Sequence, residues 1–146
     1  MIEQLDQKLK PFAASKRAII PESGWVHAIR KTLNMTLEQL GSKLGISRQG
    51  AKKLEVSEAK GSISLNSLKD VAQAMDMKLV YAIVPKEGSL DQYLDRKAEE
   101  LAKRVVLRTN QSMILEDQGV GNERIKENIE ELAEEIKREM RKTLWD

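Results

Sequence analysis

The chain has 146 residues, with 25 Lys and Arg residues against 23 Asp and Glu residues. It contains no Cys and a single His, which excludes disulfides, thiolate catalysis, Cys-based zinc sites and His-rich metal centres within one chain. Its longest apolar run, residues 79–84, is far shorter than the roughly 20 residues of a membrane span, and the N-terminus lacks a secretory pattern, so we expect a cytoplasmic protein.

Charge is distributed unevenly along the chain. Residues 1–86 contain 14 basic and 8 acidic residues, a net charge of +6, whereas residues 87–146 contain 11 and 15, a net charge of −4. A basic front half and an acidic back half indicate two tasks, and a polyanion is a candidate partner for the front half.

The first 86 residues are predicted to form an N-terminal arm followed by a small helical domain. Residues 1–23 form the arm, a short polar helix interrupted by Pro11 and followed by a turn. In the domain, residues 24–86, apolar residues at spacings of three and four predict four helices. We expect these helices at residues 25–33, 36–44, 47–57 and 65–75.

One β-strand and a C-terminal pair of helices complete the predicted fold, which is mainly α. Residues 77–84 are rich in Leu, Val, Tyr and Ile and directly precede Pro85, a pattern typical of a strand. Residues 87–146 are predicted to form a helical hairpin that dimerises or contacts a partner. Its first helix opens with the capping-box pattern Ser89-Leu-Asp-Gln92, and its second has Asn122 as the N-cap.

Residues 37–55 carry the most informative pattern. Two short helices that cross at a steep angle need a small residue at the contact, and Gly41 supplies it. Gly45 permits the left-handed backbone of a tight turn, and Ile46 fills the joint. The spacing predicts a helix-turn-helix. The alternative is an ordinary helical hairpin with a solvated basic face.

The outer face of the second helix of this motif contains no acidic residue before Glu55. Its donors match phosphate oxygens and purine edges in the major groove of DNA. The candidate DNA-binding residues on this face are Ser47, Arg48, Gln49, Lys52 and Lys53. Gly50 costs a helix interior roughly 1 kcal/mol relative to Ala. It either lets the backbone sit deep in a groove or provides clearance between helices.

Residues 25–85 resemble the Xre/Cro-type helix-turn-helix family, which includes many antitoxins. A wider set of residues resembles the family called mobile mystery protein A. This set comprises Gly24-Trp25, Ala28-Ile-Arg30, Met35, Gln39-Leu40, Leu44-Gly-Ile-Ser-Arg48, Leu54-Glu55, Glu58, Leu79-Val-Tyr-Ala-Ile-Val-Pro85, Met113, Leu115-Glu116, Gln118 and Leu144-Trp-Asp146. The resemblance implies a lambda-repressor-like domain and a DNA-binding protein encoded beside a Fic-domain protein, hence an antitoxin-like role.

The resemblance also implies roles for residues outside the recognition helix. Thr36 and Gln39 lie at a helix N-terminus, where amide groups and the helix dipole favour a phosphate, although a capping box alone also explains them. Arg30 and Lys31 are expected to clamp the flanking DNA backbone.

Two functions of different classes are consistent with these patterns. The first is a sequence-specific transcriptional regulator, a dimer that binds double-stranded DNA at a palindromic operator of its own operon. The second is a protein-interaction module that neutralises the neighbouring Fic-domain protein through residues 87–146. Fic-associated antitoxins often inhibit through a Ser/Thr-x-x-x-Glu-Gly/Asn helix, and Ser112-Met-Ile-Leu-Glu116 comes closest, but Asp117 replaces Gly or Asn.

A homodimer is expected because a single strand cannot satisfy its own backbone groups. Residues 78–84 can pair with the same strand of a second subunit or with residues 17–20 of their own chain, and both pairings are open. The first makes a symmetric dimer with two recognition helices.

Enzymatic activity is not predicted. Gly41, Gly45 and Gly50 lack the strand and the Lys-Ser/Thr pair of a phosphate-binding loop. The carboxylates of the last helix lie among Lys and Arg on a solvated face, and His27 is most simply a helix-surface or interface residue. No catalytic residue, cofactor or metal is therefore assigned.

Overall fold

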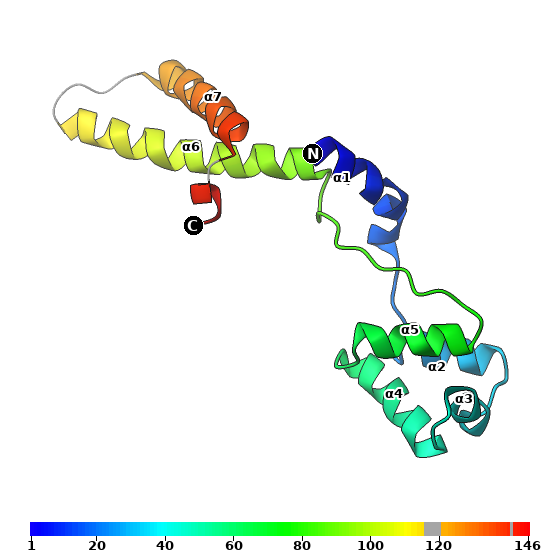
Figure 1. Cartoon of the computed structure of the whole chain (residues 1–146). Helices are drawn as coiled ribbons and strands as arrows, with labels where there is room; N and C mark the ends of the chain where they lie inside the picture. The colour runs from blue at the N-terminus through cyan, green and yellow to red at the C-terminus, as the bar shows by residue number, and fades with distance from the viewer. Residues whose placement is uncertain (116–120, 141) are drawn as a thin grey trace. The chain divides into compact units, whose positions relative to one another are not determined.

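The computed structural model describes residues 1–115, 121–140 and 142–146, and Figure 1 shows its helices in chain order. The chain divides into two compact units. Residues 17–82 form the four-helix unit, and residues 1–16 together with residues 83–146 form the hairpin unit. No described helix has the length and apolar character needed to cross a membrane.

The four-helix unit contains the helices predicted for the small domain. These are α2 (Trp25–Thr32), α3 (Leu37–Leu44), α4 (Arg48–Lys60) and α5 (Leu65–Ala74). Each helix contributes one buried apolar side chain to a common core, namely Val26, Leu40, Ala51 and Val71. Because one core draws on all four helices, their mutual arrangement is fixed by packing.

Side-chain caps set where these helices begin. The hydroxyl of Thr36 accepts a hydrogen bond from the Gln39 N–H at 3.0 Å, and the Gln39 side chain accepts one from the Thr36 N–H at 2.9 Å. This reciprocal pair confirms the predicted capping box of α3. Ser47 caps α4 and Ser64 caps α5. Each serine hydroxyl accepts a single hydrogen bond from the backbone N–H three residues later.

Glycines at two positions allow the turn between α3 and α4. Gly45 ends α3 in the left-handed conformation, with φ at 70°, as the sequence predicts. Gly41 lies where α3 meets the backbone of the turn. A Cβ atom placed there would lie 2.8 Å from the Ile46 carbonyl oxygen and 3.0 Å from that of Ser47. The close crossing therefore requires the absence of a side chain.

Replacing Gly41 by Ala is expected to lower the free energy of unfolding of the four-helix unit by about 1–3 kcal/mol, because the new methyl group meets backbone atoms that cannot rotate away. Chemical denaturation measures the change. Gly50→Ala is the matched control, since its Cβ would lie no closer than 3.3 Å to a neighbour and should change stability by at most about 1 kcal/mol. Equal effects of both substitutions would contradict this role of Gly41.

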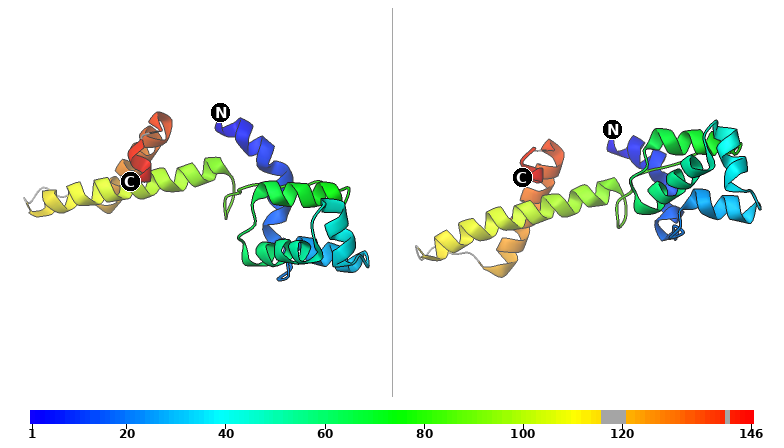
Figure 2. Two further views of the ribbon diagram at one scale, coloured as in Figure 1. Left: turned by 60° about the horizontal axis from the view of Figure 1, so that its bottom comes forward. Right: turned by 90° about the horizontal axis from the view of Figure 1, so that it is seen from below.

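The hairpin unit is built on a long helix packed against a shorter one. α6 (Leu90–Leu115) and α7 (Asn122–Glu139) lie against each other, as Figures 1 and 2 show. Their shared core contains Leu94, Ala98, Ala102 and Ile136, with Leu144 from the terminal 3₁₀ helix Lys142–Trp145. The two alanines, four residues apart on α6, leave room for close helix packing.

The N-terminal residues belong to the hairpin unit. The chain opens with α1 (Ile2–Leu9) and a 3₁₀ helix, Lys10–Arg17. The carboxylate of Asp6 accepts hydrogen bonds from the backbone N–H groups of Leu90, at 2.8 Å, and Asp91, at 3.2 Å, at the start of α6. The arm predicted at residues 1–23 is thus divided between the two units. Residues 1–16 belong to the hairpin unit, where Asp6 caps α6, and residues 17–23 belong to the four-helix unit.

The strand predicted at residues 77–84 is wrong for the single chain. The described residues include no strand, and residues 17–20, the possible partner within the chain, have no regular structure apart from Arg17. The physical reason is that a β-strand is stable only when its backbone groups form hydrogen bonds with a neighbouring strand. The alternative of a ribbon within the chain is not observed.

The helices of the hairpin unit differ in detail from the prediction. The Ser89–Gln92 capping box is confirmed by two bonds, of 3.1 and 3.2 Å. The last helix begins at Asn122 with Gly121 as its N-cap, so the assignment of Asn122 as the cap was wrong by one residue. The near-match Ser112–Glu116 ends at a residue outside the described part of the chain, so the structure does not test it.

Candidate nucleic-acid interface

The exposed side of α4 carries the polar residues singled out in the sequence. Ala51 and Glu55 face the interior, whereas the side chains of the predicted recognition face lie in solvent. The exposed residues are Arg48, Gln49, Lys52 and Lys53. The first turn of α4 contains no acidic residue, so no negative side chain there neutralises the partial positive charge of the helix N-terminus. The structure thus groups cations and an amide on one exposed face.

Ser47, Thr36 and Gln39 lie at helix starts. The Ser47 hydroxyl accepts a hydrogen bond from the Gly50 N–H at 3.0 Å, and its own proton remains available for donation. Thr36 and Gln39 are exposed and form the capping box of α3. Their caps are confirmed, and their contacts with phosphate stay predictions.

Gly50 sits in a crowded part of α4. The nearest atoms to a Cβ built there belong to Ser47, at 3.3 Å, and Ile46, at 3.4 Å. Ser47 is the N-cap of α4 and Ile46 lies in the turn before it, so none of these nearest atoms belongs to another helix and the interpretation of Gly50 as clearance between two helices finds no support. Ile46, expected to fill the joint, is instead partly exposed.

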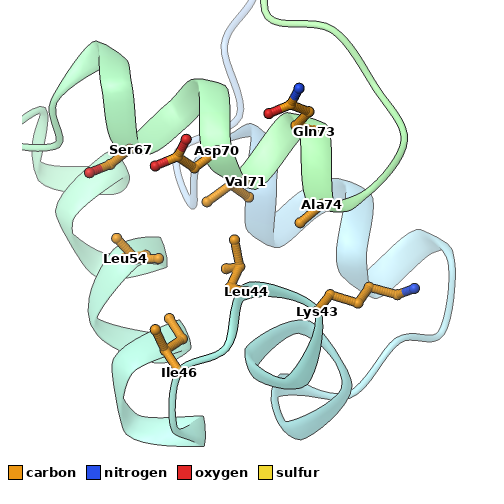
Figure 3. A pocket seen from close by; sticks show the side chains of 9 residues that line it. All are labelled: Lys43, Leu44, Ile46, Leu54, Ser67, Asp70, Val71, Gln73 and Ala74. Carbon is orange, nitrogen blue, oxygen red and sulfur yellow. The ribbon is translucent and has the colours of Figure 1, made fainter.

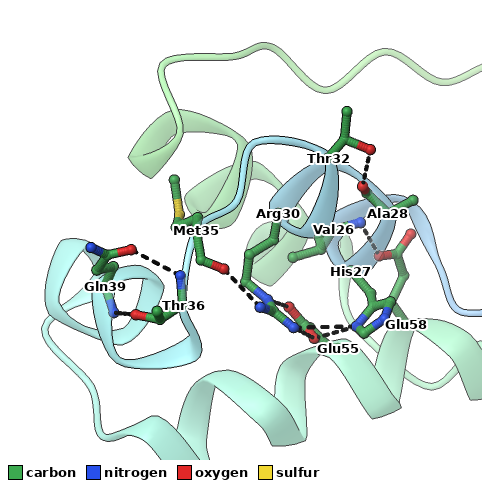
Figure 4. A network of polar contacts seen from close by, with 10 residues as sticks. All are labelled: Val26, His27, Ala28, Arg30, Thr32, Met35, Thr36, Gln39, Glu55 and Glu58. Carbon is green, nitrogen blue, oxygen red and sulfur yellow. Dashed lines mark hydrogen bonds and ion pairs between the residues drawn. The ribbon is translucent and has the colours of Figure 1, made fainter.

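Arg30 has a different place from the one predicted. Its side chain is only 7% exposed, and its guanidinium donates two parallel hydrogen bonds to Glu55 on α4 and one, of 2.8 Å, to the Met35 carbonyl oxygen (Figure 4). The proposed phosphate clamp is therefore wrong for Arg30, because the α2 face that carries it packs against α4. Lys31 is exposed and remains a candidate.

Arg30 and Glu55 anchor a buried polar network behind the recognition face. Glu55 is 5% exposed and also accepts a hydrogen bond from His27 at 2.8 Å. Since an ionised carboxylate only accepts, the His27 Nδ1 atom must carry a proton in this contact. The network joins α2, α4 and the turn before α3, and so holds α4 in position (Figure 4).

The environment of Glu55 favours its charged form. Burial raises the pKa of the Glu55 carboxyl, but the hydrogen bonds from Arg30 and His27 and their positive charges outweigh burial and lower the pKa below its ordinary value. The Glu55 carboxylate is therefore ionised at neutral pH.

This lowered pKa predicts acid sensitivity. A carboxyl whose pKa is lower in the folded state stabilises the fold fully above its ordinary value of about 4.5, and this stabilisation is lost as the pH falls through the folded pKa. We expect the free energy of unfolding of the wild type to decrease below about pH 4.5 relative to that of Glu55→Gln. Denaturation at a series of pH values measures the difference, and a constant difference would contradict this role of Glu55.

Glu58 stabilises the start of α2, a role that the sequence pattern did not indicate. Its carboxylate accepts hydrogen bonds from the N–H groups of Trp25, at 2.8 Å, and Val26, at 2.9 Å, and so caps α2 from the neighbouring α4. Gly24 precedes α2 with φ at 88°, and a Cβ there would lie 2.8 Å from the Glu58 carboxylate. The available signal was a helix start without a Ser, Thr, Asp or Asn cap.

An open hollow lies on another side of the four-helix unit, between the turn and α5. Figure 3 shows its apolar floor, formed by Leu44, Leu54 and Val71, with Lys43 and Asp70 at the rim. Its volume is about 450 Å³. The arrangement offers packing surface and a few polar groups. Among the described residues there is also no group of three or more His, Asp and Glu side chains placed to hold a metal ion.

Comparison with known protein families settles the identity of the four-helix unit. Residues 26–81 match the family model described as Helix-turn-helix. Residues 26–81 are a helix-turn-helix domain of the Xre type. The match takes in α3, the turn and α4, as well as the helices α2 and α5 that pack around them. Searches of curated proteins and of solved structures found no match to the chain.

In this helix-turn-helix domain, α3 and α4 are the two helices of the motif and α4 is the recognition helix. The family is a DNA-binding one, so the exposed cations of α4 lie on the element that such domains place in the major groove. The domain is thus a DNA-binding domain of the kind found in transcription regulators.

Proposed function

We propose that the chain is a sequence-specific transcriptional regulator that binds double-stranded DNA through α4. The observation that carries the proposal is the exposed face of Arg48, Gln49, Lys52 and Lys53 on the recognition helix of a helix-turn-helix domain. The B-DNA major groove is about 12 Å wide and admits an α-helix with its side chains. The buried ion pair of Arg30 and Glu55, together with the partly exposed His27, holds this helix from behind.

The four side chains divide into two tasks. Arg presents two donors that match the O6 and N7 atoms of guanine, and Gln pairs with the N6 and N7 atoms of adenine, so Arg48 and Gln49 are assigned to base reading. Lys52 and Lys53 supply positive charge to phosphates, with Ser47, Thr36 and Gln39 as further donors near helix starts. Arg30 has no direct role, because it is buried.

We further propose that the regulator is a homodimer on a palindromic operator of its own operon, in an antitoxin-like arrangement. A helix-turn-helix unit in a symmetric dimer reads two half-sites about one DNA turn apart. The resemblance to mobile mystery protein A supports a neighbouring Fic-domain protein as the other member of the pair.

Selection of duplexes from a random library tests the proposed function. The bound pool is expected to converge on a palindrome, and the logarithm of the binding constant should fall linearly with the logarithm of the salt concentration. A pool that remains random after repeated selection would contradict sequence-specific binding.

Arg48→Ala is expected to relax specificity at one base pair of each half-site. The loss of the two-donor contact with guanine costs about 1–3 kcal/mol at that pair and leaves discrimination elsewhere intact. Competition among operators with single base changes measures the effect. Equal losses on every sequence, random DNA included, would move Arg48 from the bases to the phosphates.

A second candidate function is binding to the neighbouring Fic-domain protein through the hairpin unit. The ring of Trp145 stacks on Tyr93 with their centroids 5.9 Å apart, yet Trp145 stays more than half exposed. Aromatic side chains of this kind anchor protein interfaces. Co-purification of the two proteins tests this function, and Trp145→Ala should weaken the association. Unchanged association would remove Trp145 from the interface.

A further inference from the structure

An exposed apolar segment follows the DNA-binding domain. After α5 ends, Met77, Val80, Tyr81 and Ile83 are 42%, 66%, 59% and 92% exposed, respectively. No charged residue interrupts the chain between Lys78 and Lys86. Contiguous exposed apolar side chains on a soluble domain mark a surface that binds another molecule.

The backbone of this segment is unpaired as well. Within the described residues, no hydrogen bond to another protein group is made by the N–H or C=O groups of residues 78–84. Leu, Val, Tyr and Ile side chains favour extended backbone, and Pro85 ends the run. The segment thus has the composition of a strand and the free backbone groups of a sheet edge.

Within residues 17–82, all of which the structure describes, no backbone group pairs with this segment. Ile19 and Ile20, on the other segment of similar character in the four-helix unit, are themselves largely exposed. The Lys69 ammonium, on the preceding helix α5, lies 5.9 Å from the centre of the Tyr81 ring. A second molecule can supply the pairing that the four-helix unit does not.

We propose that the occupant is a second copy of this chain, joined by antiparallel pairing of residues 78–84 centred on Tyr81. The segment suits itself: with this centre, Leu79 faces Ile83 of the partner subunit and Val80 faces Ala82 of the partner subunit. Centring on Ala82 would instead place Lys78 opposite Lys86 of the partner subunit, where like charges repel. An uncharged contact is also what two otherwise positively charged domains require.

This inference deepens the proposed function. Only the use of the dimer, which is to read two DNA half-sites, rests on that function. Residue 78 follows the last residue of α5 by four positions, so the pairing axis belongs to the same unit as α4. Symmetric pairing there holds two recognition helices at one fixed spacing. A dimer through this segment is nevertheless a property of the protein alone and can be tested without DNA.

Because the chain contains no Cys, a disulfide between two subunits can form only at a Cys that is introduced. On the symmetry axis, position 81 of each subunit faces its own copy, with Cα atoms about 4.5–5.5 Å apart, which is within disulfide range. In a glutathione redox buffer, full-length Tyr81→Cys should form a covalent dimer about tenfold faster than the exposed control Ser62→Cys. Val80→Cys should crosslink more slowly than Tyr81→Cys, because its own copy lies diagonally across the pair.

Sedimentation of the unmodified chain and of Val80→Asp/Ile83→Asp completes the test. The chain should sediment as a dimer and the double variant as a monomer with unchanged helical circular dichroism. A monomeric wild type, equal crosslinking of positions 81 and 62, or a dimeric double variant would overturn the proposal. Burial of the segment only in a complex with a different protein would overturn it too. Failure to bind DNA with efficient crosslinking at position 81 would contradict the proposed function alone.

Discussion

The double substitution Lys52→Glu and Lys53→Glu is expected to reduce affinity for the selected operator by at least about 100-fold at low salt, roughly 3 kcal/mol. Each change removes a cation from the exposed face of α4 and puts a carboxylate against the phosphates. The slope of the binding constant against salt should also become shallower by about one for each lost phosphate contact. Fluorescence anisotropy of a labelled operator over a salt series measures both quantities.

A matched control separates local from overall charge. Lys103→Glu/Arg104→Glu changes the same number of charges on exposed residues of the hairpin unit, and both double variants have a net charge of −2. The control is expected to keep its affinity within a few-fold, because both changes lie outside the DNA-binding domain and leave the cations of α4 in place. Equal losses in both variants would show that overall charge, rather than the α4 face, determines binding.

Glu55→Gln is expected to lower the free energy of unfolding of the DNA-binding domain by about 3–5 kcal/mol, because it leaves the buried guanidinium of Arg30 without its anion. Hydrogen bonding by the amide does not replace the lost charge. Denaturation monitored by Trp25 fluorescence in a Trp145→Phe background reports this domain alone, since the two Trp residues belong to different units.

The double variant Arg30→Met/Glu55→Leu distinguishes loss of charge pairing from loss of packing. Apolar residues of similar volume remove both buried charges together, and such replacements are often close to neutral. The double variant should therefore be more stable than Glu55→Gln. If it is equally unstable, the network stabilises the domain through contacts other than the ion pair.

The helices of the DNA-binding domain could be predicted because their signals are local. Apolar spacing placed α2 to α5 within a few residues of their observed ends. The Thr36–Gln39 pattern specified the start of α3, and Gly45 specified its end. Gly41 was predicted from the packing that a helix-turn-helix demands, and the structure places it against turn backbone. The exposed face of α4 followed from the same periodicity.

Features that depend on distant residues could not be predicted in this way. Arg30 looked like a surface cation because nothing nearby in the sequence shows that Glu55 would pair with it, 25 residues later. The cap that Glu58 provides for α2 and the one that Asp6 provides for α6 have the same origin. The predicted strand failed for a related reason: composition gives a preference for extended backbone, but only a partner makes a strand.

The central claim, that α4 meets DNA through its exposed cationic face, is tested most directly by a nitrogen-15 NMR titration of the full chain with its selected duplex. The account predicts the largest amide shifts at residues 47–53, with smaller ones near Thr36 and Gln39 and little change in α7. Shifts confined to residues 90–145, with residues 47–53 unaffected at saturating duplex, would contradict it.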